Sequence, residues 1–141
     1  ASHELKQKVV ELGLASKVSF VGSIVEREIL KRYYVAADLF LFPSLYDNAP
    51  LVIREAAALG TPSVLIRDST ASEIISDSVN GFLSLNSTEA YSNRIREILC
   101  STAIIKQVGE EASRTIARSW EDVAGEVYDR YNRLIKRNGN K

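Results

Sequence analysis

The sequence is poor in the residues that most often build metal and redox sites. It has one cysteine, Cys100, and one histidine, His3, among 141 residues. A single cysteine forms no internal disulfide, and one histidine near the N-terminus is a weak basis for a metal site or for histidine-based catalysis. Net charge is also lacking, because 18 basic side chains balance 18 acidic ones. The composition therefore predicts no metal, and it gives no reason to expect a nucleic-acid partner.

Long apolar runs are absent too. No run approaches the roughly 20 residues of a membrane span, and no signal peptide is visible. A hydrophobic content of 45% and a charged content of 26% are ordinary for a globular chain. The sequence predicts a soluble domain from a reducing compartment, which we take as cytoplasmic.

Apolar runs of strand length alternate with helical patterns in the first 85 residues. We expect four strands, at 17–22, 38–44, 63–66 and 81–85, and helices at 24–37, about 50–59 and 71–77. Strands that are apolar on both faces and alternate with helices indicate a parallel sheet covered on both sides. After Leu85 only helices are expected, at 87–99, 103–117 and 121–137.

The chain opens directly in a helical pattern that Gly13 is expected to end. Four short strands are few for a doubly wound domain, which usually has five or six. We therefore expect residues 1–141 to be a single partial α/β domain, Rossmann-like and truncated at its N-terminal end, with the first βα units lying upstream.

Glu55 interrupts the helix expected at 50–59. Leu51, Val52, Ala58 and Leu59 lie three or four residues from it and share its face. A face so apolar is expected to turn toward a core, where carboxylates are rarely found without a partner. An ion pair with a basic side chain from a neighbouring helix would explain Glu55 structurally, and a ligand hydroxyl would explain it functionally.

The loop after the strand at 38–44 is the expected ligand site, because open parallel sheets bind ligands beyond the carboxyl ends of their strands. It holds Asp47 and Asn48 and leads to Ala49, Pro50 and Leu51, the expected first turn of the helix. The free N–H groups of such a helix end favour an anion such as phosphate. Asp47 alone is equally well explained as an N-cap or Asx-turn residue.

The stretch "FPSLYDNAPLVIREAAALGTPSVL" resembles the central motif of retaining glycosyltransferases with the GT-B fold, in particular family 4. Its frame is Asp47, seven residues, Glu55, and then Gly60, Thr61 and Pro62. The preceding strand, helix and strand, the segment "ASEIISDSVNGFL" and the helix in "RSWEDVAGEVYDRYNRLI" are similar to the same family. The resemblance covers nearly the whole chain and implies the C-terminal, donor-binding domain.

The resemblance implies a role for each matching residue. Glu55 matches the acid that accepts hydrogen bonds from the ribose of the donor. Asp47 matches the acid near the donor sugar and is the candidate catalytic residue. Asn48, Ala49, Pro50 and Leu51 match the turn whose amides approach the sugar and diphosphate. Ser23 and Ile24 match a loop beside the base.

The resemblance also implies partners. The donor substrate would be a nucleotide diphosphate sugar, with no metal or other cofactor. An acceptor-binding N-terminal domain and a basic pair for the diphosphate would lie in the parent chain, which would also mediate any membrane association. The helix at 120–137 would be the C-terminal helix that crosses toward that domain. We expect the fragment alone to be inactive as a hexosyltransferase.

The sequence departs from the family pattern in three places. Asp47 stands where glutamate is commoner, Asn48-Ala49-Pro50 replaces a glycine-rich turn, and Ser69-Thr70 stands where relatives often have two glycines. Arg67 follows a strand but is expected to be a surface residue.

Two other interpretations of the sequence stay open, a non-catalytic nucleotide-binding module and a scaffold domain in which Asp47 and Glu55 are structural. A nucleotide-sugar epimerase of the same architecture fits the C-terminal segment less well.

Overall fold

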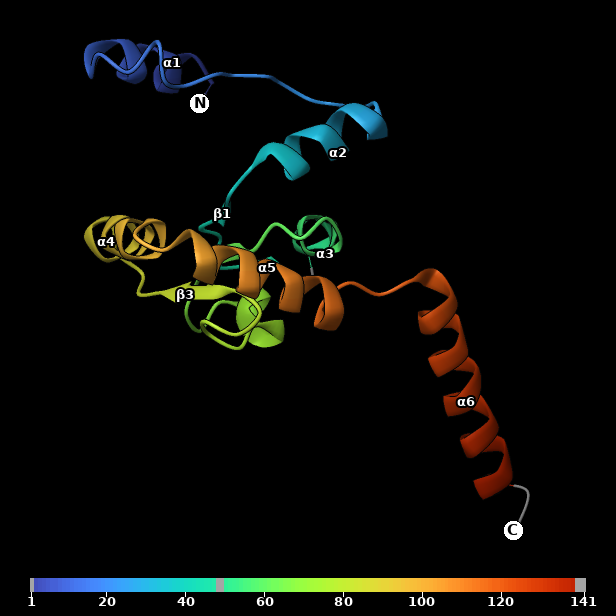
Figure 1. Ribbon diagram of the computed structural model, residues 1–141. Helices are drawn as coiled ribbons and strands as arrows, with labels where there is room; N and C mark the ends of the chain where they lie inside the picture. Colours follow the sequence, from blue (N-terminus) through green and yellow to red (C-terminus); the bar gives the residue numbers. More distant parts are fainter. Residues whose placement is uncertain (1, 48–49, 139–141) are drawn as a thin grey trace. The chain divides into compact units, whose positions relative to one another are not determined.

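A computed structural model of the protein describes residues 2–47 and 50–138 (Figure 1). They divide into two compact units, one ending at Leu30 and one beginning at Lys31. Helix α2 (Arg27–Ala36) spans the boundary between them.

The first unit contains α1 (Ser2–Glu11) and an extended segment after it. Gly13 adopts φ +68°, and the N–H groups of Gly13 and Leu14 donate to the carbonyls of Val10 and Val9, each at 2.9 Å. The prediction that Gly13 ends this helix is therefore confirmed.

The expected strand at 17–22 is wrong. Residues 18–26 contain no helix or strand. The apolar side chains of Val18, Phe20 and Val21 are 38%, 43% and 50% exposed. A β-rich run becomes a strand only when a neighbouring strand accepts its backbone hydrogen bonds, and within the described ranges no strand pairs with this run.

The second unit contains a parallel sheet of three strands in the order β1-β2-β3. These are β1 (Phe40–Phe42), β2 (Ser63–Ile66) and β3 (Phe82–Ser84). β2 is the central strand, and all four of its residues are buried. The three strands lie where the sequence predicts them, so the parallel sheet is confirmed with one strand fewer than expected.

Helices follow each strand. They are α3 (Leu51–Ala58), a short 3₁₀ helix η1 (Thr70–Ile74), α4 (Thr88–Leu99), α5 (Thr102–Thr115) and α6 (Trp120–Asn138). Ser87 and Ser101 cap α4 and α5, because their hydroxyls accept the N–H groups of Ala90 and Ile104. The last three predicted helices are confirmed to within two residues, whereas the helix expected at 71–77 is the shorter η1.

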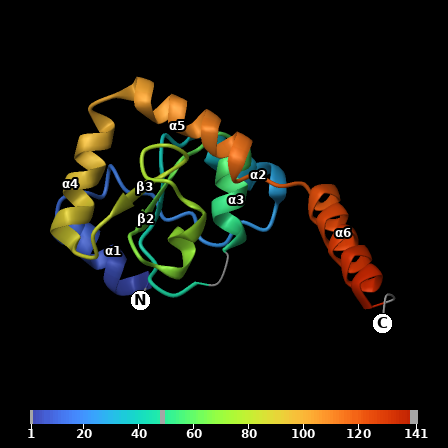
Figure 2. The same cartoon turned by 90° about the horizontal axis from the view of Figure 1, so that it is seen from below.

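The core lies on both faces of the sheet. Val64 and Leu65 are adjacent on β2 and belong to two separate buried clusters, because successive strand residues point to opposite faces. Leu65 packs with Ile53 of α3, and Val64 packs with Ile98 of α4. Figure 2 shows α3 and α4 beside the strands with α5 running past both, and α5 contributes to each cluster.

A close approach of two backbones fixes the end of α3. Gly60 follows the helix with φ +77°. A Cβ atom built on Gly109 of α5 would lie 2.1 Å from the carbonyl oxygen of Gly60, so only glycine lets α5 pack this closely. Nearby, the buried Thr61 donates its hydroxyl to the carbonyl of Tyr34 at 2.7 Å. These contacts hold the helix that carries Glu55.

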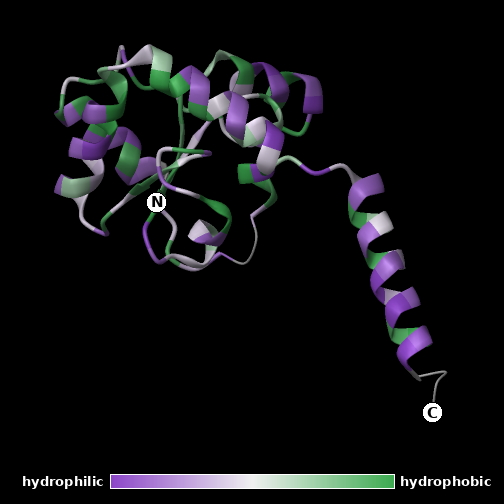
Figure 3. Cartoon of the chain, turned by 60° about the horizontal axis from the view of Figure 1, so that its bottom comes forward, coloured by the Kyte–Doolittle hydropathy of each residue, from purple (hydrophilic) through white to green (hydrophobic). Residues whose placement is uncertain are grey.

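Helix α6 carries apolar and polar residues along its length (Figure 3). Tyr128, Tyr131 and Ile135 are each more than 60% exposed. None of its described side chains is buried. That residues 120–137 cross toward a second domain stays a prediction, as does the single partial domain.

Candidate functional site

The loop between β1 and α3 holds most of the predicted site residues. β1 ends at Phe42, and α3 begins at Leu51. Pro50 is the N-cap residue, with φ −62° and ψ 121°, so it stands just before the helix and not in its first turn. Its carbonyl accepts the N–H of Ile53 at 3.2 Å. The N–H groups of Leu51 and Val52 precede that of Ile53 and have no acceptor within α3, so they can serve a ligand.

Two residues of the predicted site, Asn48 and Ala49, lie outside the described residues. Leu51, the next residue of that turn, is 60% exposed. The side chain of Pro50 is buried, so its ring anchors the start of α3. The described part of the turn thus combines a buried proline with an exposed leucine at the helix start.

Glu55 is exposed, which corrects the expectation that its face turns toward a core. The buried face of α3 is formed by Ile53, Ala56 and Ala57, which have at most 1% of their surface exposed. These residues lie at i, i+3 and i+4, and Ile53 and Ala57 belong to one buried cluster with Leu65 of β2 and Ala112 of α5. Leu51 lies with Glu55 on the open side. The helix is short and almost wholly apolar, so its sequence did not show which face is buried.

Tyr34 is the protein partner of Glu55. Its hydroxyl donates to Oε2 of Glu55 at 3.4 Å, a long hydrogen bond. The Tyr34 ring is 8% exposed and packs edge-on against Phe40, with ring centroids 5.6 Å apart. Burial raises the pKa of the Tyr34 hydroxyl, and the Glu55 charge and hydrogen bond raise it further. Tyr34 therefore stays a donor at neutral pH while its ring packs against β1.

The structural explanation of Glu55 required a basic partner on a neighbouring helix. In the described part of the chain Glu55 has none. The adjacent Arg54 turns the other way and donates from Nη1 to the carbonyl of Ile116, at the end of α5, at 2.8 Å. The Glu55 carboxylate thus keeps acceptor capacity that no cation of the described chain occupies.

Asp47 is held through its backbone. Its N–H donates to Oγ1 of Thr70 at 2.9 Å, and its carbonyl accepts the hydroxyl of Thr70 at 2.9 Å. Pro50 is the N-cap of α3, so the explanation of Asp47 as the N-cap is wrong. Its carboxylate has no hydrogen-bond or ion-pair partner among residues 2–47 and 50–138. Within the described residues, Asp47 and Glu55 both keep acceptor sites for donors from a ligand, and the Asx-turn explanation of Asp47 stays a prediction because it falls on residues outside the described ranges.

Ser23 and Ile24 belong to the first unit. Ser23 is exposed and Ile24 half-buried, in a segment without helix or strand. Their predicted place beside a nucleotide base stays a prediction.

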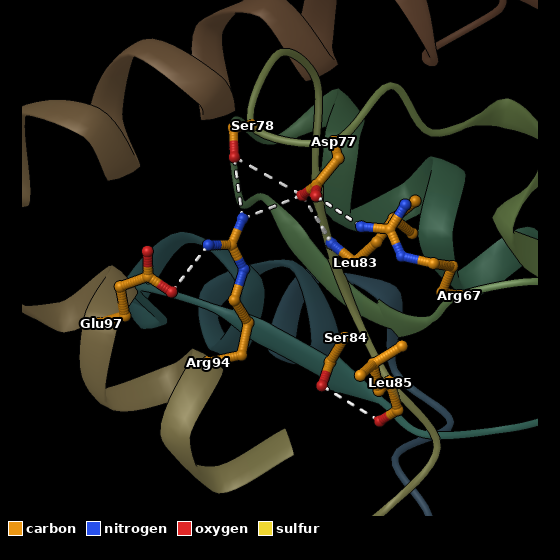
Figure 4. A network of polar contacts seen from close by, with 8 residues as sticks. All are labelled: Arg67, Asp77, Ser78, Leu83, Ser84, Leu85, Arg94 and Glu97. Atoms are coloured by element: carbon orange, nitrogen blue, oxygen red, sulfur yellow. Dashed lines mark hydrogen bonds and ion pairs between the residues drawn. The ribbon is translucent and has the colours of Figure 1, made fainter. Parts of the chain in front are cut away.

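A third acid, Asp77, was not singled out by the sequence. Its Oδ2 accepts a hydrogen bond from Nη2 of Arg67, and its Oδ1 accepts one from Nη2 of Arg94, each at 2.9 Å (Figure 4). Oδ1 also accepts the N–H of Leu83 in β3 at 3.0 Å, and Arg94 pairs with Glu97 at 2.8 Å. These residues border an open hollow of about 530 Å³.

The electrostatics of Asp77 follow from these contacts. Burial raises the pKa of its carboxyl, but the Leu83 N–H and the guanidinium groups of Arg94 and Arg67 lower it more, so the net pKa lies below the usual value. Arg67 is 44% exposed, which confirms it as a surface residue. The contact of Asp77 with Arg94 joins residues 17 positions apart and left no periodic signal in the sequence.

No group of three His, Cys, Asp or Glu side chains in the described ranges could hold a metal ion. None of the helices in those ranges is long and apolar enough to cross a membrane.

The fold defines the class of the protein. Sucrose-phosphate synthase from Thermosynechococcus elongatus superimposes with a TM-score of 0.82 at 28% identity, over 95% of this chain and 34% of that one. Anabaena Alr3699/HepE, solved with UDP, gives a TM-score of 0.70 at 28% identity, over 80% of this chain and 31% of that one. The parallel sheet with helices on both faces is thus that of GT-B glycosyltransferases, as the sequence predicted.

The family follows from the sequence match. The family described as glycosyl transferases group 1 matches residues 1–115. D-inositol 3-phosphate glycosyltransferase 2 of Catenulispora acidiphila is 32% identical over 127 residues, which cover 89% of this chain and 30% of that relative. The chain belongs to the glycosyl transferases group 1 family. It spans about a third of the length of the relatives that it matches over most of its own length.

Proposed function

We propose that this chain is the C-terminal, donor-binding domain of a retaining glycosyltransferase of the family 4 type. The parent enzyme would transfer a sugar from a nucleotide diphosphate donor to an acceptor hydroxyl with retention of configuration. Membership of the glycosyl transferases group 1 family supports this proposal. So does the likeness to Anabaena Alr3699/HepE, which has been solved with UDP and also with UDP-glucose.

The observation that carries the proposal is the state of the two acids. Asp47 and Glu55 follow β1 and have no basic partner in the described chain. Carboxylates are acceptors, and the hydroxyls of sugars and riboses are donors. In this proposal Glu55 accepts from the ribose and Asp47 from the donor sugar, with Asp47 as the catalytic acid residue of the motif.

The start of α3 would hold the diphosphate. The turn formed by Asn48, Ala49, Pro50 and Leu51 would approach the sugar and diphosphate through its backbone N–H groups, which proline lacks. A helix N-terminus stabilises negative charge. Donors aimed at the leaving diphosphate would lower the barrier without a required metal. Ser23 and Ile24 would lie beside the base.

The parent chain would supply what transfer still needs. The acceptor-binding domain and a basic pair for the diphosphate would come from residues outside this chain. We expect a cytoplasmic enzyme whose membrane association, where it exists, depends on the parent protein. This chain alone is expected to bind the donor weakly, at about millimolar Kd, and not to transfer sugar.

An amide NMR titration of this chain tests the proposal. UDP-glucose, GDP-mannose and ADP-glucose are added in turn, each alongside its own nucleotide diphosphate. We expect one pair to shift the resonances of residues 44–56, with the sugar form binding more tightly than the diphosphate. Glu55→Gln is expected to weaken that binding about tenfold, because a hydrogen bond to a charged group is lost. Glu110→Gln, an exposed acid on α5, is the matched control and should change nothing.

Each contrary outcome points to one alternative. Equal affinity for the sugar form and the diphosphate would indicate a non-catalytic nucleotide-binding module. No shift with any ligand, together with a clear loss of stability in Glu55→Gln, would indicate a scaffold domain in which Glu55 is structural. Shifts at Ser23 and Ile24 test their predicted place beside the base separately.

A further inference from the structure

The residues immediately before Asp47 in its loop are exposed. Tyr46, immediately before Asp47, is 88% exposed, and Leu45 is 37% exposed. The N-cap residue of α3, Pro50, has no side chain that could cap the helix and bind back to the loop. An exposed loop of this kind samples many backbone conformations unless another segment holds it.

Thr70 holds this loop from the turn that follows β2. One atom, the hydroxyl oxygen Oγ1 of Thr70, accepts the N–H of Asp47 and donates to the carbonyl of the same residue, both at 2.9 Å. The N–H of Thr70 adds a third bond, to the carbonyl of Leu45 at 3.3 Å. A hydroxyl has one proton to donate and lone pairs to accept with, so both functions are used here on one residue.

The two bonds to Asp47 have a geometric consequence. They fix the N–H on one side of its Cα and the carbonyl on the other, which restrains both φ and ψ of Asp47. The direction of the Cα–Cβ bond follows from these two angles. No hydrogen-bond or ion-pair partner of the carboxylate lies among residues 2–47 and 50–138, so Thr70 fixes the direction of the Asp47 Cα–Cβ bond without occupying the acceptor sites of the carboxylate.

Thr70 is itself attached to the core. It is the first residue of η1, whose Ala71 is 3% exposed and packs in the same cluster as Leu65 of β2. The turn before it is closed by the N–H of Ser69, which donates to the carbonyl of Ile66 at 3.3 Å. The hydroxyl that holds the loop therefore stands on a rigid support.

We propose that Thr70 is a positioning residue that directs the Asp47 carboxylate toward the donor sugar. The inference rests on the proposed function, in which Asp47 meets the sugar and Glu55 the ribose. It assigns Thr70 control over one part of donor binding, the part that distinguishes the nucleotide sugar from the bare nucleotide diphosphate.

Thr70→Val and Thr70→Ser separate the hydroxyl from the volume of the side chain. Valine keeps the shape but neither donates nor accepts, and serine keeps both functions. The Kd of each variant is measured for UDP-glucose and UDP, or for whichever of the GDP-mannose and ADP-glucose pairs the unmodified chain prefers. We expect Thr70→Val to weaken binding of the nucleotide sugar about fivefold and to leave the diphosphate within about twofold. Thr70→Ser should retain the original preference, as should Thr88→Val, the matched control at the exposed start of α4.

Hydrogen exchange gives a second reading that needs no ligand. The Asp47 amide should exchange slowly in the unmodified chain and in Thr70→Ser, and quickly in Thr70→Val. If Thr70→Val weakens the nucleotide sugar and the diphosphate equally, or weakens neither, the role of Thr70 is overturned and the proposed function still stands. Failure of the unmodified chain to prefer any nucleotide sugar overturns the proposed function and the Thr70 role together.

Discussion

The second unit contains two sets of carboxylates that differ in their hydrogen-bond and ion-pair partners. Asp77 accepts from two arginines and from the backbone of β3. Asp47 and Glu55 face no cation of the described chain, and the only side-chain donor to either carboxylate there is the Tyr34 hydroxyl at 3.4 Å.

The difference separates a structural acid from two available ones. A carboxylate that is saturated by guanidinium groups stabilises the fold and has little left to offer a ligand. A carboxylate without a cation contributes little to the fold and keeps its lone pairs for donors that arrive with a ligand. Substitutions of the two sets should therefore act on different properties, stability for Asp77 and binding for Asp47 and Glu55.

Asp77→Ala should have the largest effect. It leaves Arg94 and the N–H of Leu83 without their acceptor, and we expect a loss of about 2–3 kcal/mol in the free energy of unfolding, measured with urea. Glu97→Ala is the control, because Glu97 is 69% exposed and its pair with Arg94 should contribute about 0.5 kcal/mol. Equal effects of the two variants would show that the Asp77 contacts do not stabilise the fold.

Acid pH should reveal the same contacts. The pKa of Asp77 is lowered in the folded chain, since the Leu83 N–H, Arg94 and Arg67 outweigh the burial that raises it. As the pH falls through about 4, the ordinary pKa of an aspartate, Asp77 is protonated in the unfolded chain before it is protonated in the folded chain. The stability due to Asp77 is thus present above that pH and lost as the pH falls through the lower folded pKa. Urea unfolding from pH 7 to pH 2 should show a smaller loss in Asp77→Asn, and an identical loss would contradict the assignment.

Tyr34→Phe should have a moderate effect on binding. The ring keeps its contact with Phe40, but Glu55 loses the hydroxyl that orients it. We expect nucleotide affinity to fall about threefold and stability to change by about 1 kcal/mol or less. Tyr33→Phe, 49% exposed in the same helix, is the matched control. Unchanged affinity in calorimetric titration would show that Tyr34 only packs.

Glu55→Gln should have the smallest effect on stability. Glu55 is exposed, and glutamine can still accept from Tyr34, so the free energy of unfolding should change by about 0.5 kcal/mol or less. The free energies of unfolding of Glu55→Gln and Asp77→Asn are measured with urea and compared. A loss as large as that of Asp77→Asn would remove the distinction between the two sets of acids.

Most helices and strands of the second unit were predictable from local patterns. The apolar runs at 38–44 and 63–66 and the helices after Leu85 lie where the sequence predicts them. The run at 17–22 was not predictable in the same way, because β propensity describes how a residue fits a paired surface and not whether a partner strand is present. The buried side of α3 was equally open, since leucine, valine and alanine surround Glu55 on the helix.

The sequence by itself determined the order of elements and the spacing of Asp47 and Glu55 along the chain, because both depend on residues close to one another. Only the tertiary structure decided which acids are paired. The Thr70 hydroxyl meets Asp47 across 23 positions, and Arg94 meets Asp77 across 17. Such contacts depend on how β2, η1 and α4 pack, and no local pattern encodes that packing.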